Sequence, residues 1–125
     1  MSNLQNIIET AFEGRADISH NNVSKEVRDA VEQTIADIDN GNIRVAEKKD
    51  SDWIVHQWIK KAVLLSFRIS DNGIVRDGYT NYFDKVDSKF SSYSDEDFRN
   101  GGFRVVPPAA VRKGSFIAKN VVLMP

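Results

Sequence analysis

The sequence contains no cysteine and only two histidines, His20 and His56, among its 125 residues. The absence of cysteine excludes disulfides, thiolate metal ligands and cysteine nucleophiles. Two histidines are too few for a multi-histidine metal centre, so we expect no metal site in this chain. The sequence also lacks an apolar run near the roughly 20 residues that cross a bilayer, and its first residues show no basic region followed by an apolar one. We therefore expect neither membrane insertion nor a signal peptide.

The two signs of charge almost cancel, because 17 Lys and Arg residues are balanced by 18 Asp and Glu residues, which gives a net charge of −1. With no basic helix in the sequence, this balance argues against nucleic-acid binding. The charge is unevenly spread, however. The residues after Asp97 carry no carboxylate side chain but five cations, Arg99, Arg104, Arg112, Lys113 and Lys119. Such a basic end can attract anions or simply solvate a surface, and charge alone favours solvation.

Helical and strand periods divide the first half of the chain. Apolar residues follow helical spacing in residues 4–12, 27–38 and 58–67, and the third segment is predicted to be the central helix of the core. Between the second and third segments, apolar and polar residues alternate over 43–46 and 53–56, which predicts a β-hairpin. A chain of this length supports one compact domain with little left for a second.

The residues that could act in catalysis have few suitable partners nearby in the sequence. His56 falls in the predicted strand near Trp53 and Trp58, so we interpret it as a packed or hydrogen-bonded core histidine rather than a general base. Ser66 and Ser115 have no histidine or acid at a recognisable spacing, so neither is predicted to be a serine nucleophile.

Residues 74–93 are polar and irregular but contain five aromatic side chains, Tyr79, Tyr82, Phe83, Phe90 and Tyr93. We predict a long loop that these aromatics pin to the core, with an aromatic ligand cage as the alternative. Residues 94–98 then predict a short capped helix. Its acidic residues are Asp95, Glu96 and Asp97. They resemble a pair of catalytic acids, but the favourable effect of negative charge at a helix N-terminus is the preferred explanation.

The end of the chain follows a period of six. Val111, Ile117 and Leu123 lie six residues apart, and Val105 continues the register backwards. Neither a helix nor an alternating strand explains this period, whereas a hexapeptide parallel β-helix does, because one aliphatic residue per hexad points into its prism. Three aliphatic residues in register can also arise by chance in a valine-rich tail. The tail after Val111 supplies less than one coil of three hexads, so we expect the sequence to break off where a repeat domain begins.

Five blocks of the sequence have long, specific matches: residues 4–13, 44–48, 56–69, 82–86 and 102–112. Together they resemble the tetrahydrodipicolinate N-succinyltransferase family of acyltransferases. The resemblance covers the whole chain but less than half of the family's usual length. It implies an α/β fold class: an α+β N-terminal domain of helices with a small β-hairpin over residues 1–102, followed over residues 103–125 by the first hexads of a left-handed parallel β-helix.

The resemblance also implies an activity. Members of the family are expected to be cytoplasmic homotrimers. They are expected to transfer a succinyl group from succinyl-CoA to the amine of ring-opened tetrahydrodipicolinate, a step in lysine and diaminopimelate biosynthesis. Succinyl-CoA is then a co-substrate, and no bound cofactor is expected. The active sites are expected between neighbouring β-helices, with the catalytic acids and the CoA groove beyond residue 125. We therefore expect no catalytic residue in this chain and no activity of the chain alone.

One ligand residue follows from the resemblance. The segment 102–108 matches the family segment whose arginine binds the dicarboxylate substrate, and that arginine corresponds to Arg104. A guanidinium suits this role because its planar fork donates two parallel hydrogen bonds to one carboxylate. From the residues alone, an ion pair of Arg104 with Asp95 or Asp97 is the preferred interpretation. With the resemblance, substrate binding is preferred.

Two functions of other classes stay open. The chain can be a stand-alone, non-catalytic module that binds a carboxylate or a partner protein. It can also belong to a hexapeptide acyltransferase that uses another acyl donor. The residues present do not distinguish acyl donors, because the donor groove is expected outside them.

Overall fold

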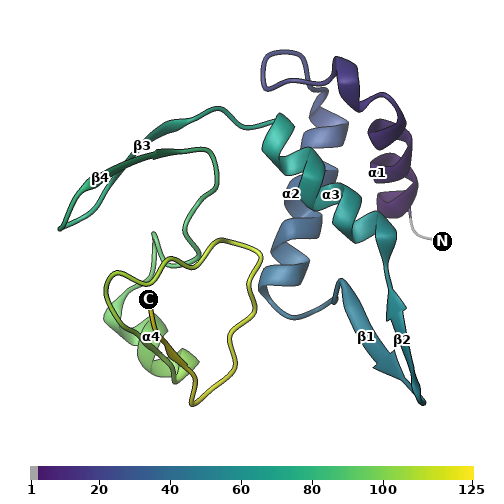
Figure 1. Cartoon of the computed structure of the whole chain (residues 1–125). Coiled ribbons are helices and arrows are strands. Elements are labelled where there is room, and N and C mark those ends of the chain that lie inside the picture. Colours follow the sequence, from purple (N-terminus) through teal and green to yellow (C-terminus); the bar gives the residue numbers. More distant parts are fainter. Residues whose placement is uncertain (1–2) are drawn as a thin grey trace.

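The computed structural model describes residues 3–125, and three helices form its main body (Figure 1). They are α1 (Asn3–Glu13), α2 (Lys25–Asp39) and α3 (Gln57–Arg68), with a single 3-10 turn, η1 (Arg15–Asp17), between the first two. All three helices predicted from apolar spacing are confirmed. Each contributes one apolar stripe to a common interior, as the helical period requires.

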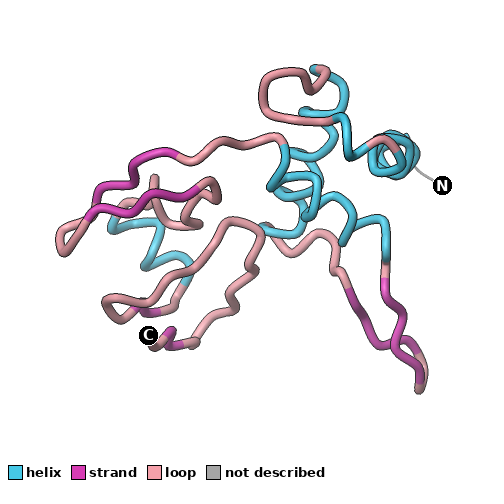
Figure 2. Tube along the Cα trace, turned by 45° about the horizontal axis from the view of Figure 1, so that its top comes forward, coloured by secondary structure: helices cyan, strands magenta, loops and turns pink. Residues whose placement is uncertain are grey.

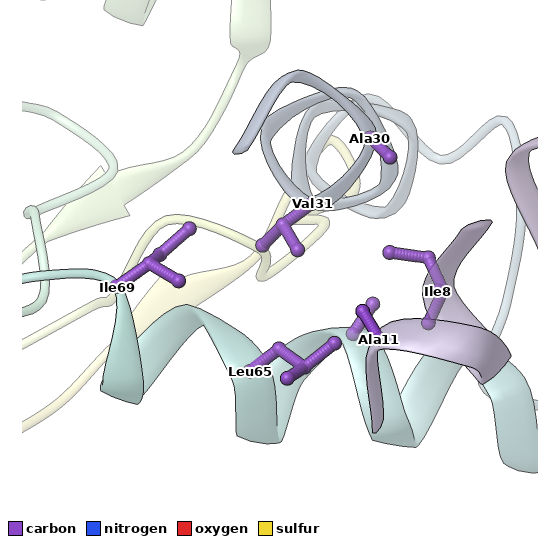
Figure 3. Packing of buried hydrophobic residues seen from close by; sticks show 7 residues of the cluster. Ile8, Ala11, Ala30, Val31, Leu65 and Ile69 are labelled. Carbon is purple, nitrogen blue, oxygen red and sulfur yellow. The ribbon is translucent and has the colours of Figure 1, made fainter. Parts of the chain in front are cut away.

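The core lies where the three helices meet (Figure 3). Its buried side chains include Ile8, Ala11, Ala30, Val31, Leu65 and Ile69. Small alanines let the helices approach closely, while the larger residues fill the space between them. Each fully buried Ile or Leu contributes about 1.5–3 kcal/mol relative to exposure.

The ends of α2 are defined by local chemistry. Ser24 caps its N-terminus, where the hydroxyl oxygen accepts a hydrogen bond from the backbone N–H of Val27 at 3.2 Å. Asn40 is the C-cap of α2, and the next residue, Gly41, adopts a left-handed φ of +77°. A Cβ at Gly41 would approach the ring of Phe116 to 2.8 Å, so the absence of a side chain there lets the C-terminal segment pack against the end of α2.

The predicted first hairpin is confirmed as β1 (Ala46–Lys49) paired antiparallel with β2 (Asp52–Val55). It projects from the helical body in Figure 1. The prediction for His56 is wrong in its details. His56 follows the strand as the N-cap of α3, and its half-buried imidazole Nε2 lies 3.4 Å from Oε2 of Glu47 rather than in the core. A hydrogen bond from Lys49 lowers the pKa of Glu47, with a smaller contribution from His56.

The prediction of a pinned loop over residues 74–93 is wrong for residues 74–84. Residues 85–93 do form a loop, in which Phe90 and Tyr93 are half-buried and pack against other rings. The structure has a second antiparallel hairpin, β3 (Gly73–Arg76) and β4 (Asn81–Asp84), which also extends from the body. Its aromatics are solvent-exposed instead of buried, with Tyr79 75% and Phe83 71% exposed. Asp77 makes the tight turn, since its backbone N–H donates to Thr80 O and its carboxylate accepts the N–H of Tyr79.

The predicted short helix is confirmed as α4 (Asp95–Gly101). Ser94 and Asp97 form a reciprocal capping box, so the acidic residues serve the helix N-terminus as expected. Beside this helix lies a cluster of four rings, Phe90, Tyr93, Phe98 and Phe103. This aromatic cluster is a second, smaller apolar centre, separate from the helical core.

The C-terminal segment loops back and pairs with itself. β5 (Arg104–Val105) and β6 (Val122–Leu123) are parallel, with Arg104 opposite Val122. The expected length of less than one coil was counted from Val111. The strand pairing instead begins at Arg104, and its partner Val122 lies eighteen residues later, which is the length of three hexads. The four aliphatic residues in the period-six register, Val105, Val111, Ile117 and Leu123, are all half-buried.

The architecture of residues 3–125 is therefore α+β, with helices and three separate two-stranded sheets (Figure 2). Among these residues, no helix combines the length and the apolar character that a bilayer crossing requires.

Candidate functional site

The backbone around Arg104 is held by hydrogen bonds to one neighbouring segment, residues 120–123. The N–H of Arg104 donates to Val121 O at 3.0 Å, and the N–H of Val106 donates to Leu123 O at 2.9 Å. Just before the strand, Gly102 O accepts the N–H of Asn120 at 2.7 Å. Two parallel segments therefore fix the direction in which the side chain of residue 104 leaves the backbone, while its neighbour at 105 turns inward.

The carboxylates proposed as alternative partners of Arg104 are engaged elsewhere. Asp95 accepts a hydrogen bond from Nε of Arg99 at 2.7 Å, and Asp97 accepts the N–H of Ser94 at 2.9 Å. Arg104 itself is exposed and forms no ion pair with any residue of the described range 3–125. Its guanidinium donors are therefore available to an external anion.

A shallow depression of about 630 Å³ lies at this guanidinium. Its lining comes from α4, from β5 and β6, and from the residues just before each of these strands. It consists of Asp95, Phe98, Arg99, Gly102, Phe103, Arg104, Asn120, Val121 and Val122. The lining combines two guanidinium groups with one carboxylate and two rings. Such a surface can bind an anion by charge-assisted hydrogen bonds but contains no group placed for nucleophilic or acid–base chemistry.

The side chain next to Arg104 belongs to the aromatic cluster. The ring centroid of Phe103 lies 5.3 Å from that of Phe90 and 6.0 Å from that of Phe98. Offset and edge contacts of this kind favour defined ring orientations. The cluster therefore fixes the position of Phe103, and the strand pairing fixes the backbone of Arg104.

The other candidates from the sequence are scattered. Ser66 donates its hydroxyl to the backbone carbonyl of Val63 at 2.6 Å within α3, a local helix contact. His20 lies 3.6 Å from Asp71, near the surface and away from His56. Within residues 3–125 no three His, Asp or Glu side chains gather as metal ligands would.

The contact between Asp39 and Lys89 was not predicted from the sequence. Nζ of Lys89 lies 2.9 Å from Oδ1 of Asp39, and both side chains are largely buried, at 5% and 14% exposure. The same oxygen accepts the backbone N–H of Gly114 at 2.8 Å. Fifty residues separate Asp39 from Lys89, and no local pattern connects two residues so far apart.

Comparison with known proteins identifies similar sequences. A family model described as "Tetrahydrodipicolinate N-succinyltransferase N-terminal" matches residues 3–69. Proteins named 2,3,4,5-tetrahydropyridine-2,6-dicarboxylate N-succinyltransferase are 62% identical in Nitrosomonas europaea, 61% in Nitrosospira multiformis and 60% in Salmonella heidelberg. Each match covers 100% of this chain and 46% of the relative. The chain thus spans about half the length of these relatives.

Proposed function

The chain belongs to the tetrahydrodipicolinate N-succinyltransferase family, and we propose that it is the N-terminal part of an enzyme that moves a succinyl group from succinyl-CoA to its dicarboxylate acceptor. The names of the relatives supply the acceptor, 2,3,4,5-tetrahydropyridine-2,6-dicarboxylate, and the acyl group. The reaction belongs to the biosynthesis of diaminopimelate and lysine in the cytoplasm.

The acceptor must expose an amine before it reacts. Addition of water opens its ring, and the freed amine nitrogen attacks the thioester carbonyl of succinyl-CoA. A C–N bond forms, the C–S bond breaks, and CoA leaves as a thiol that takes up the proton released by the nitrogen. No residue of this chain is assigned to that proton transfer. The catalytic groups belong to the remainder of the enzyme.

Arg104 is the residue by which this chain contributes to the site. We assign it to one carboxylate of the acceptor, bound through the bidentate geometry that a guanidinium offers. The observation that carries the assignment is the exposed guanidinium, which has no ion-pair partner within residues 3–125, on a strand whose backbone is paired with β6. A lysine would supply the charge but not the planar fork.

Residues 103–125 are proposed as the first coil of a left-handed parallel β-helix, with residues 1–102 as the N-terminal domain. Two observations support this. The parallel partners Arg104 and Val122 are eighteen residues apart, the length of three hexads. The aliphatic residues of the hexad register are half-buried, as inward-pointing positions of a first coil should be. Assembly as a homotrimer, with acceptor and donor bound between neighbouring β-helices, completes the proposal.

The proposal is tested with the complete enzyme, which we define as this chain joined to the remainder of the Nitrosomonas europaea relative. We expect CoA thiol release that depends on both succinyl-CoA and 2-aminopimelate, a seven-carbon amino dicarboxylate. Acetyl-CoA should react much more slowly. The 125-residue chain alone should show no turnover, because binding by one arginine stabilises substrate and transition state alike. Absence of succinyl transfer by the complete enzyme, or faster transfer of acetyl groups, contradicts the proposal.

A further inference from the structure

Asp39 and Lys89 form a buried ion pair at the junction between the helical body and the C-terminal segment. Nζ of Lys89 contacts both Oδ1 of Asp39, at 2.9 Å, and the backbone carbonyl of Asp39, at 3.0 Å. Only 5% of the Lys89 side chain and 14% of the Asp39 side chain are exposed. Both charged groups are therefore largely shielded from solvent.

Helix stability does not explain this arrangement. Asp39 is the last residue of α2, where a negative charge opposes the helix dipole. Apolar side chains of similar volume are commonly as stabilising as a buried ion pair, because both charges must be desolvated. What the pair supplies is a defined geometry, because two partners, the Lys89 ammonium and the Gly114 N–H, make three hydrogen-bonding contacts with the single residue Asp39.

The partners of Asp39 come from two segments of the chain. Lys89 belongs to the segment after β4, and Gly114 belongs to the C-terminal segment. These segments are also joined to each other, since the N–H of Lys89 donates to Val111 O and the N–H of Lys113 donates to Asp87 O, both at 2.9 Å. The end of α2 thus anchors a pair of strand-like segments.

A short path of packed residues connects this anchor to Arg104. Lys89 is followed directly by Phe90, whose ring centroid lies 5.3 Å from that of Phe103. Phe103 is followed directly by Arg104. A shift of Lys89 relative to α2 therefore displaces the ring against which the residue before Arg104 packs. Dense packing transmits such a shift because few voids absorb it.

We propose that the Asp39–Lys89 pair is a positioning device that sets the place of the Arg104 guanidinium relative to the helical body. The inference rests on the proposed function for the identity of the ligand, the acceptor carboxylate. Asp39 and Lys89 touch neither substrate, and they act through Phe90 and Phe103.

The test replaces the pair without leaving a buried charge. In the variant Asp39→Asn/Lys89→Met, the amide oxygen can still accept the N–H of Gly114, and the methionine fills the volume of the lysine. In the complete enzyme we expect the KM for 2-aminopimelate to rise about tenfold, below the roughly hundredfold loss that a 1 Å misplacement can cause. The KM for succinyl-CoA should stay within about twofold.

A second background separates positioning from general damage. If the pair acts through Arg104, the same double substitution should change the acceptor KM by less than about twofold once Arg104→Ala is present. An equal rise in both backgrounds overturns the proposal, and so does an unchanged acceptor KM in the first. The matched control is Lys25→Met/Asp29→Asn, which removes an exposed ion pair elsewhere on α2 and should leave both KM values unchanged.

Amide hydrogen exchange in the complete enzyme, where the β5–β6 pairing is expected to be protected, gives a readout without activity. We expect the amides of Arg104 and Val106 to exchange about tenfold faster in Asp39→Asn/Lys89→Met, while the amide of Leu65 keeps its protection. Unchanged exchange at these two amides overturns the positioning role whatever the kinetics show. An unchanged acceptor KM in Arg104→Ala alone, with faster exchange in the pair variant, instead rejects the assignment of Arg104 to the acceptor.

Discussion

Arg104 and Val122 lie side by side in a parallel strand pair although eighteen residues separate them in the sequence. The carbonyl of Val121 and the N–H of Arg104 make the hydrogen bond that begins the pairing, at 3.0 Å. Because Val105 turns inward, the side chain at position 104 must turn outward. The guanidinium of Arg104 therefore projects from a paired strand rather than from a loop.

Substitution of Arg104 should weaken acceptor binding selectively. In the complete enzyme, Arg104→Ala removes the charge and the fork, whereas Arg104→Lys keeps the charge alone. A charge-assisted bidentate contact contributes about 1.5–3 kcal/mol, so the KM for 2-aminopimelate should rise by about one to two decades. The KM for succinyl-CoA should not change. Steady-state kinetics with each substrate varied in turn measures both values.

The control for this series is Arg76, an exposed arginine in β3. Arg76→Ala and Arg76→Lys should leave both KM values unchanged. If the Arg104 variants behave like the Arg76 variants, Arg104 is a surface cation and its assignment to the acceptor is wrong.

Gly101 offers a way to disturb Arg104 without touching it. A Cβ at Gly101 would overlap the ring of Phe103, the residue before Arg104. Gly101→Ala should therefore push this ring out of the aromatic cluster, destabilise the protein by about 1–3 kcal/mol and raise the acceptor KM severalfold. Gly78→Ala is the control, since a Cβ there meets nothing within 4 Å. Equal acceptor KM values for the two variants would mean that the cluster does not position Arg104.

Two adjacent leucines of α3 test the helical core. Leu65 is fully buried among the three helices (Figure 3), whereas Leu64 is 42% exposed. Leu65→Ala should lower the free energy of unfolding by about 2–5 kcal/mol, because it removes packed atoms and leaves a cavity. Leu64→Ala should cost less than about 1 kcal/mol. Urea unfolding followed by circular dichroism compares them. Similar costs would show that α3 does not bury the face that its spacing predicts.

The helices were predictable because their signals are local. Apolar spacing in α1, α2 and α3, and the Ser94 cap of α4, each depend on residues within one or two turns. The hexad period at the end of the chain is also local, and half-burial of Val111 and Ile117 follows it. In each case the predicted feature needs no knowledge of what lies far away in sequence.

The second hairpin and the buried pair were not predictable for the opposite reason. The aromatics of residues 74–84 indicate burial, since aromatic side chains usually stabilise a core, yet Tyr79 and Phe83 are exposed. The contact of Asp39 with Lys89 depends on the complete fold. Arg104 was singled out by family resemblance alone, because charge and spacing favoured a surface ion pair that the structure does not contain.

The C-terminal segment should be less protected than the helical core in the isolated chain. Three of its large apolar side chains, Phe116, Val122 and Met124, are 52–68% exposed. The backbone groups on the outer side of β6 form an open strand edge, which favours pairing with another chain. In a dilute monomer we expect the amides of residues 111–123 to exchange faster than those of residues 58–67 in α3.

Hydrogen exchange across a concentration series tests this expectation, and the complete enzyme provides the control. Each exposed aliphatic side chain that another coil covers gains roughly 1.5–3 kcal/mol, so the same amides should become strongly protected in the complete enzyme. Protection that rises with concentration in the 125-residue chain would show association through the open edge. If residues 111–123 are already as protected as residues 58–67 in the dilute monomer, the segment is covered by its own chain, and its assignment as the first coil of a stacked β-helix fails.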